Sequence, residues 1–137
     1  MARDLAIVKG LSGVRYALRR FLAASEVLSR AAGVTQQQYQ VMLAIRACEG
    51  GAISMKELAE QLLLTPHAAV QMIDRLSAAE LAERRHSKED RRIVRVSLTR
   101  KGARLIDELA ARHFEELLDQ EPRLSRSLAQ LTRLARS

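Results

Sequence analysis

The hydrophobic positions of this chain recur with two different periods, which predict mainly α-helices and one small β-hairpin. From about residue 4 to 31, apolar side chains recur at steps of three and four, the spacing of one helix face. These residues are Leu11, Val14, Leu18, Phe21, Leu22, Val27 and Leu28. Gly33 stands where a helix commonly ends. Gly10 and Gly13 weaken the first turns, so we expect the start of this helix to fray or bend.

Three helix-start signals follow in the middle of the chain. They are Thr35 with Gln38, Ser54 with Glu57, and Thr65 with Pro66. The first two are capping boxes, and the third is an N-cap followed by proline at the first helical position. The predicted helices therefore run from about 35 to Gly50, from 54 to about 62, and from 66 to about 79. Ile53 lies in the first gap and is expected to add a strand to the later hairpin.

The helix predicted from Pro66 has two different faces. Ala69, Val70, Ile73 and Leu76 form an apolar stripe, and His67, Ala68, Gln71 and Arg75 form the opposite one. A helix that packs on one side and offers small, polar and cationic groups on the other suits the DNA major groove. Together with the preceding short helix it predicts a helix-turn-helix. An ordinary amphipathic helix pair would show the same pattern, so the segment that follows must distinguish a DNA-binding helix-turn-helix from such a pair.

The segment from Leu81 to Gly102 predicts a basic hairpin. Val94, Val96 and Leu98 occupy every second position and so share one face of a strand. A polar turn of five residues, His86 to Asp90, precedes this strand. Residues 84–92 contain five Lys or Arg and two acids, a net charge of +3. A basic loop at a hairpin tip suits a polyanion, although a solvated hairpin is the plain alternative. Directly after the helix pair, it predicts a winged helix-turn-helix.

The end of the chain is predicted to be helical, with an interruption at Pro122. Its apolar stripes are Ala103, Ile106, Leu109, Ala110, Phe114, Leu117 and Leu118, then Leu124, Leu128, Leu131 and Leu134. A short amphipathic helix cannot bury such leucines alone. Uncovered apolar faces at both ends of the chain therefore predict a symmetric dimer. The expected dimerisation residues are Leu11, Leu18, Phe114, Leu124, Leu128, Leu131 and Leu134.

Length and charge narrow the class of protein. A chain of 137 residues is expected to form a single domain, with a winged helix-turn-helix lobe at about 35–100 and dimerisation helices at about 4–31 and 102–136. The net charge of +7 favours an anionic partner. No apolar run approaches the ~20 residues of a membrane span, and the first residues do not form a secretory signal. A cytoplasmic location without membrane attachment is therefore expected.

Catalytic and metal chemistry find little support. His67, His86 and His113 stand on separate predicted elements without paired spacing, so we expect no metal site and no cofactor. No P-loop or dinucleotide-binding glycine motif is present, and the protein is not expected to be an enzyme. The single cysteine, Cys48, lies near a helix end. A buried cysteine usually acts as a small hydrophobe.

One set of spaced residues resembles the MarR-type transcriptional regulators. It consists of Asp74-Arg75-Leu76, Leu81-Ala82-Glu83-Arg84, Asp90-Arg91-Arg92, Val96-Ser97-Leu98-Thr99 and Gly102. The resemblance implies a homodimer with intertwined terminal helices and two recognition helices in successive major grooves of a palindromic site. It also implies that Arg92 enters a minor groove, that Asp90 helps hold the wing arginines, and that a small anionic or aromatic ligand releases the DNA.

The sequence departs from that family at two places. Glu80 stands between the recognition helix and the hairpin, where the family usually has glycine, and a left-handed backbone there would cost about 1 kcal/mol. The wing tip carries His86, Ser87 and Lys88 where prolines are common, which predicts a more mobile wing that keeps its charge.

These patterns identify the candidate site residues. The expected DNA contacts are Ser54, Thr65, Pro66, His67, Ala68, Gln71, Arg75, Arg84, Arg85, Lys88, Asp90, Arg91 and Arg92. Arg15, Arg19 or Arg46 could meet an anionic ligand between the dimer helices and the winged lobe. Three alternatives stay open: a non-specific architectural DNA-binding protein, an interaction module that has lost DNA binding, and a regulator that senses oxidants through Cys48.

Overall fold

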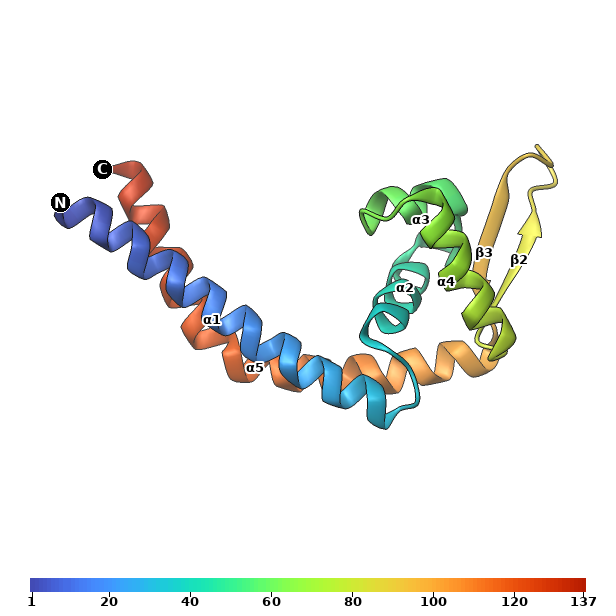
Figure 1. Cartoon of the computed structure of the whole chain (residues 1–137), viewed down its shortest axis with the longest axis horizontal. Helices are drawn as coiled ribbons and strands as arrows, with labels where there is room; N and C mark the ends of the chain where they lie inside the picture. Colours follow the sequence, from blue (N-terminus) through green and yellow to red (C-terminus); the bar gives the residue numbers. More distant parts are fainter. The chain divides into compact units, whose positions relative to one another are not determined.

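The computed structural model describes all 137 residues and divides them into two compact units. Unit 1 comprises Met1–Leu28 and Ala111–Ser137, and unit 2 comprises Ser29–Ala110. The elements are α1 (Ala2–Ala31), α2 (Gln36–Ala47), a 3-10 turn η1 (Glu49–Gly51), β1 (Ala52–Ser54), α3 (Met55–Gln61), α4 (Pro66–Ala78), β2 (Ala82–His86), β3 (Val94–Leu98) and α5 (Arg100–Arg136) (Figure 1). The predicted mainly helical fold with a small hairpin is confirmed. None of these helices combines the length and apolar character that a membrane crossing requires.

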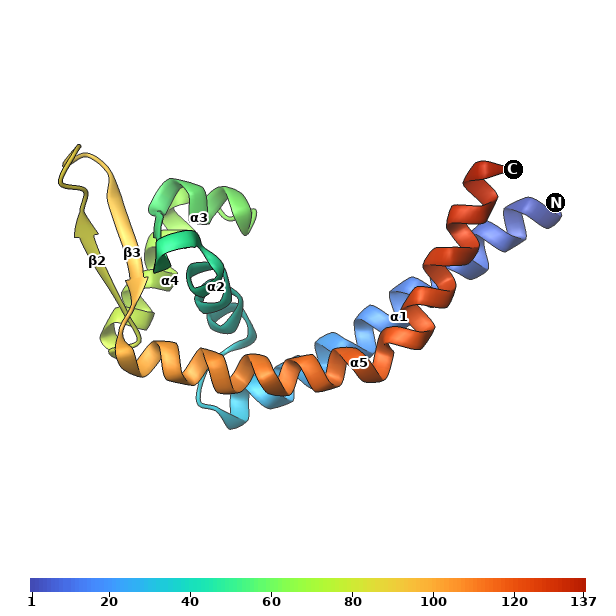
Figure 2. The same cartoon turned by 180° about the vertical axis from the view of Figure 1, so that it is seen from behind.

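In unit 1, α1 and α5 lie side by side in opposite directions, as both views show (Figures 1 and 2). Small residues allow the close approach. A Cβ atom on Gly10 would lie 2.6 Å from Leu131 Cδ2, and one on Gly13 would collide with Ser127 Oγ. Ala17 is also buried, at 1% exposure. The expectation that the glycines fray α1 is therefore wrong: the helix is continuous, because they serve packing on α5.

The predicted interruption at Pro122 is also wrong, since α5 continues to Arg136 with the proline inside it. A proline in a helix interior removes one hydrogen bond and costs about 3 kcal/mol. Contacts beyond it offset that cost. Leu131 fits against Gly10, and Arg3 donates a hydrogen bond to the Leu134 carbonyl at 3.2 Å. Packing on α1 thus keeps the last four turns helical, which local propensity could not show.

Unit 2 encloses the main core between its helices and a three-stranded antiparallel sheet. Met42, Ile45, Leu58, Ile73, Leu76 and Val96 are fully buried. The strand order is β1–β3–β2. Val96 of the central strand β3 pairs with Ile53 of β1 on one side and with Arg84 of β2 on the other. The prediction that Ile53 adds a third strand is confirmed. The hairpin projects beyond the helices of this unit (Figure 1).

Local signals in the sequence account for most helix boundaries. The Thr35 hydroxyl accepts from the Gln38 N–H while the Gln38 side chain accepts from the Thr35 N–H, which confirms the first capping box. Gly33, with φ of 85°, ends α1, and the Val34 N–H donates back to the Ser29 carbonyl at 3.0 Å. These contacts satisfy backbone groups that helix ends otherwise leave without a partner.

Two residues other than glycine adopt a left-handed backbone. Glu80 has φ of 61°, so the costly left-handed backbone considered for that position is adopted, and Leu63 in the turn between α3 and α4 has φ of 55°. Both side chains are exposed, so neither strained position is held by packing of its own side chain. A branched or charged side chain at such a position costs about 1 kcal/mol relative to glycine.

We therefore expect Glu80→Gly and Leu63→Gly each to raise the free energy of unfolding by roughly 1 kcal/mol. Chemical denaturation measures the change. Glu80→Ala is the matched control, because it removes the carboxylate yet keeps the Cβ atom that causes the strain. A gain with alanine equal to the gain with glycine would show that charge, rather than backbone strain, sets the stability at this position.

Candidate nucleic-acid interface

Helix α4 presents a polar surface, as its sequence predicts. His67, Gln71 and Arg75 are exposed on one side, and Ala68 beside them is half-buried. The opposite side is buried by Ala69, Met72, Ile73 and Leu76, with Val70 half-buried. Met72 was not assigned to the apolar stripe, although it follows Ala69 by three residues. The exposed groups include the two side chain types, amide and guanidinium, that read base edges bidentately.

The residues that begin α3 and α4 have a defined local role. The Ser54 hydroxyl accepts from the Glu57 N–H at 3.1 Å, and the Thr65 hydroxyl accepts from the Ala68 N–H at 3.1 Å. Pro66 occupies the first helical position after Thr65. A hydroxyl that accepts one bond still has its proton to donate. Ser54 and Thr65 can therefore cap their helices and donate to a phosphate oxygen at the same time.

The wing turn is longer than the sequence indicated and is organised by one carboxylate. Seven residues separate β2 from β3, so Arg91 and Arg92 lie in the turn rather than in a strand. Asp90 Oδ1 accepts from the Arg92 N–H at 3.0 Å and from Arg92 Nε at 3.1 Å, while Oδ2 accepts from a second guanidinium nitrogen at 3.1 Å. These three bonds hold Arg92 against Asp90 within the seven-residue turn.

The Asp90–Arg92 pair stays charged over the neutral pH range. Hydrogen bonds from the Arg92 side chain, and then from its backbone, hold the pKa of Asp90 below its usual value. Because the pKa of Asp90 is lowered, its carboxylate is ionised and its bonds to Arg92 are fully present at pH values above the ordinary carboxyl pKa. These bonds are lost only when the pH falls through the lowered pKa. The Arg92 side chain is 91% exposed, so the tether orients a guanidinium that still faces solvent.

The other wing cations differ in what they contact. Arg84 forms an ion pair with Asp74 of α4, which joins the wing to the recognition helix. Arg85 lies 3.8 Å from Glu83, a weak surface pair. His86 Nδ1 donates to the Arg91 carbonyl at 2.7 Å. Lys88 and Arg91 are exposed cations of the turn, available to a polyanion.

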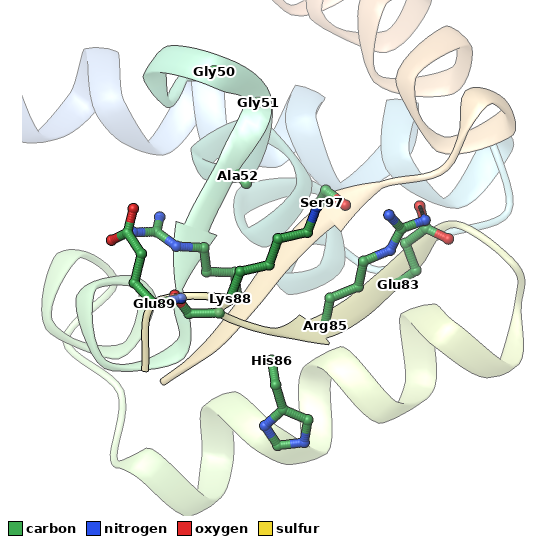
Figure 3. A pocket seen from close by; sticks show the side chains of 11 residues that line it. Gly50, Gly51, Ala52, Glu83, Arg85, His86, Lys88, Glu89 and Ser97 are labelled. Atoms are coloured by element: carbon green, nitrogen blue, oxygen red, sulfur yellow. Dashed lines mark hydrogen bonds and ion pairs between the residues drawn. The ribbon is translucent and has the colours of Figure 1, made fainter. Parts of the chain in front are cut away.

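The face of the sheet that points away from the core holds a shallow hollow of about 520 Å³ (Figure 3). Arg85, Lys88 and Arg95 bring positive charge to it, and Lys88 extends over this face toward Ser97 (Figure 3). Glu83 and Glu89 also line it. Arg95 was missed among the candidate residues. Its place between Val94 and Val96 could have revealed it, since alternation puts it on the outer face.

Arg46, considered for ligand binding, and Cys48, considered for oxidant sensing, both have hydrogen-bond partners within the chain. Arg46 donates two hydrogen bonds to the Asp107 carboxylate at 2.9 and 3.0 Å, and this pairing lowers the pKa of Asp107. Arg15 and Arg19 are exposed. The half-buried Cys48 Sγ donates to the Ala52 carbonyl at 3.1 Å, which engages the thiol proton. A thiol titration of the folded protein distinguishes this structural role from oxidant sensing.

The three histidines lie apart. His67 is on α4 and His86 is in the wing, whereas His113 is buried in unit 1, with Nε2 2.7 Å from the Ser25 hydroxyl. Phe21 meets the His113 ring edge-on at 6.1 Å. No group of three or more potential metal ligands comes together.

The predicted dimerisation residues fall into two sets. Leu11, Leu18, Phe114 and Leu128 are 41–61% exposed within a single chain. Leu124, Leu131 and Leu134 are half-buried, and Leu131 contacts Gly10 of the same chain. The leucine stripe after Pro122 is thus partly covered by α1, and the exposed apolar surface lies on the neighbouring flank. The assignment of these residues to a dimer stays a prediction.

Comparison with known proteins gives consistent similarities. The sequence profile of the MarR family matches residues 32–93. YhbI, an uncharacterised HTH-type transcriptional regulator of Bacillus subtilis, is 31% identical over 118 residues, which cover 80% of this chain and 75% of YhbI. The HTH-type transcriptional repressor MdtR of B. subtilis is 34% identical over 79 residues, 58% of this chain. The match spans half the length of MdtR.

Solved structures are similar in fold. AbsC, a MarR family transcriptional regulator of Streptomyces coelicolor, gives a TM-score of 0.75 at 22% identity, over 86% of this chain and 81% of AbsC. NadR, solved in complex with 4-hydroxyphenylacetate, gives 0.72 at 24% identity, over 88% of this chain and 84% of NadR. The fold of this chain is thus one that these proteins share.

Proposed function

The chain belongs to the MarR family of DNA-binding transcriptional regulators, and from this membership we propose that it is a repressor that binds a palindromic operator as a homodimer. The observation that supports this proposal is that one unit exposes two different groups suited to reading DNA. Gln71 and Arg75 are exposed one helical turn apart on α4, and Arg92 is held by Asp90 at the wing. The first pair suits base edges in a major groove, and the second suits a minor groove.

The apolar face of unit 1 supports the homodimer. We define it as Leu11, Leu18, Leu22, Phe114, Leu117, Leu118 and Leu128, all of them exposed in the single chain. On α1 the three leucines share one flank, and on α5 the four residues share the flank beside it. Several large apolar side chains on one surface mark an interaction site. Two copies that meet through this surface would place two recognition helices on a palindrome.

Competition between DNA duplexes tests the proposed function. A bound duplex selected from random fragments is challenged with unrelated DNA over a series of salt concentrations. A sequence-specific regulator keeps its selected duplex against a large excess of unrelated DNA, because typical specificity ratios are about 10³ or more. Equal competition by unrelated DNA would favour an architectural protein. No salt-dependent binding at all would favour an interaction module.

We also propose that a small anionic or aromatic ligand releases this protein from DNA. NadR was solved with 4-hydroxyphenylacetate, an aromatic carboxylate. In this chain Arg15 and Arg19 are exposed cations, whereas Arg46 is already paired with Asp107. With two Phe, two Tyr and no Trp, aromatic stacking around a ligand is limited, so charge should dominate recognition.

Screening aromatic carboxylates for displacement of bound DNA tests the release. At least one member of a broad panel should lower the affinity for DNA in a saturable manner, and sodium chloride at equal ionic strength should not. Failure of the whole panel would leave a regulator that works without such a ligand.

A further inference from the structure

A second hollow, of about 220 Å³, lies in unit 1 between α1 and α5, apart from the DNA-reading groups. Its lining residues are Tyr16 and Arg20 from α1, and Asp119, Gln120, Pro122, Arg123 and Arg126 from α5. Seven side chains from two antiparallel helices thus surround one concave surface. None of these residues belongs to α4 or to the wing, so the proposed DNA contacts do not explain why they lie together.

The hollow has an excess of positive charge. Three guanidinium groups and one carboxylate line it. Arg20 and Arg126 are both exposed, and neither forms an ion pair within the chain. Like charges that converge on one surface repel each other, and a bound anion would relieve that repulsion. The charge of the hollow therefore favours an anionic occupant.

One of the three guanidinium groups lies over an aromatic ring. The Arg123 guanidinium carbon lies 4.3 Å from the centre of the Tyr16 ring, within the range of a cation–π interaction. Stacking leaves the N–H edges of the guanidinium free to donate. A planar fork of this kind matches a carboxylate or phosphoryl group bidentately. Because the group is already oriented, less conformational freedom is lost on binding.

Pro122 adds a second, independent feature. It lies inside α5 and lines the hollow. A proline there lacks the N–H that would bond the Leu118 carbonyl, and its ring crowds that carbonyl. The Leu118 carbonyl, left without its usual helical donor, thus lies one turn before the arginine cluster.

The hollow lies on the opposite flank of unit 1 from the apolar face. On α1, Tyr16 and Arg20 are roughly half a turn around the helix from Leu11, Leu18 and Leu22. On α5, Arg123 is about half a turn around the helix from Phe114, and Arg126 is about a third of a turn from it. A homodimer formed through the apolar face would therefore leave this hollow open to solvent.

We propose that this hollow is a binding site for a small anion that carries two or more acidic groups, either carboxylates or phosphoryl groups. Arg20 and Arg126 donate from the two helices, and the stacked Arg123 donates between them. The site belongs to unit 1 alone, so its occupancy does not require DNA.

Tyrosine fluorescence gives a direct test on the full chain. The protein has no Trp and two Tyr, and Tyr39 is buried in α2. In a Tyr39→Phe background, Tyr16 is the only tyrosine and lies at the hollow. Pyrophosphate and citrate are the probes, with sodium chloride at matched ionic strength as the reference. Each probe should change the Tyr16 fluorescence saturably and raise the unfolding midpoint, because it binds the folded state.

Matched arginine variants locate the binding. Arg20→Gln and Arg126→Gln should each weaken binding of the probes about tenfold, as expected for loss of a charge-assisted hydrogen bond. Lys9→Gln and Arg133→Gln each remove one positive charge from the same two helices at exposed positions outside the hollow, and should change binding less than about twofold. Arg20→Lys keeps the charge without the fork and should fall between them.

Three results would overturn the proposal. The first is no response of either readout beyond that of sodium chloride. The second is equal weakening by all four glutamine variants, which would mean general charge attraction. The third is a loss of DNA affinity for Arg20→Gln in anion-free buffer as large as that for Arg92→Ala, which would assign the hollow to DNA phosphates.

Discussion

Replacing Phe114 or Leu118 with glutamate should split the homodimer and lower the affinity for operator DNA by about a hundredfold or more. The two side chains are 61% and 51% exposed in the single chain, so the substitutions should leave its folding nearly intact. In a dimer formed through the apolar face they become buried, and a buried charge without a partner is strongly unfavourable. A monomer holds one half-site and loses the gain from binding two at once.

Sedimentation and operator titration measure the two effects together. Gln130→Glu is the matched control, because it adds the same charge to an exposed position of α5 on the opposite flank. It should leave both the dimer and the operator affinity unchanged within about twofold. Dimers that survive Phe114→Glu and Leu118→Glu would place the interface elsewhere.

Substitution of Gln71 and of Arg92 should have different consequences for DNA binding. Gln71→Ala removes a group that pairs bidentately with a base, so it should reduce the preference for operator over random DNA by about 1–3 kcal/mol. Arg92→Ala removes a cation from the minor groove, whose hydrogen-bonding pattern is degenerate. It should weaken binding to all sequences and reduce the salt slope by roughly one.

Titration of operator and random duplexes across a salt series separates the two variants. Arg104→Ala is a control for charge, since Arg104 is exposed in unit 2 and was not assigned to DNA. Its effect on the salt slope should be smaller than that of Arg92→Ala. If the Gln71 and Arg92 variants lose specificity and salt dependence in equal measure, the assignment of groove roles is wrong.

Features set by residues close in sequence were predictable. The Thr35 capping box, the proline at the start of α4 and the two faces of α4 depend on spacings of three and four residues. The third strand at Ile53 followed from a single apolar residue, whereas the departure from the family at Glu80 marked the position without deciding its backbone conformation. In each case the physical cause acts within one turn or one strand.

Features set by distant contacts were not predictable. The continuity of α5 through Pro122 depends on packing against α1. Arg3 and Leu134, which share a hydrogen bond in this packing, are more than one hundred residues apart in the sequence. The wing turn contains three hydrogen bonds between Asp90 and Arg92, which the hydrophobic spacing used for the prediction does not record. Arg84, which the sequence assigned to DNA contact, forms an ion pair with Asp74 of α4, and this pairing could not be predicted from composition.

Selection of bound fragments from random DNA tests the central claim most directly, namely that this chain is a homodimeric, sequence-specific regulator. The full-length protein should enrich an inverted repeat whose half-site centres lie about one helical turn, or roughly 10 base pairs, apart. The enrichment should weaken for Gln71→Ala at defined base positions. A selected pool with no shared motif, or with a single unrepeated motif, would contradict the account.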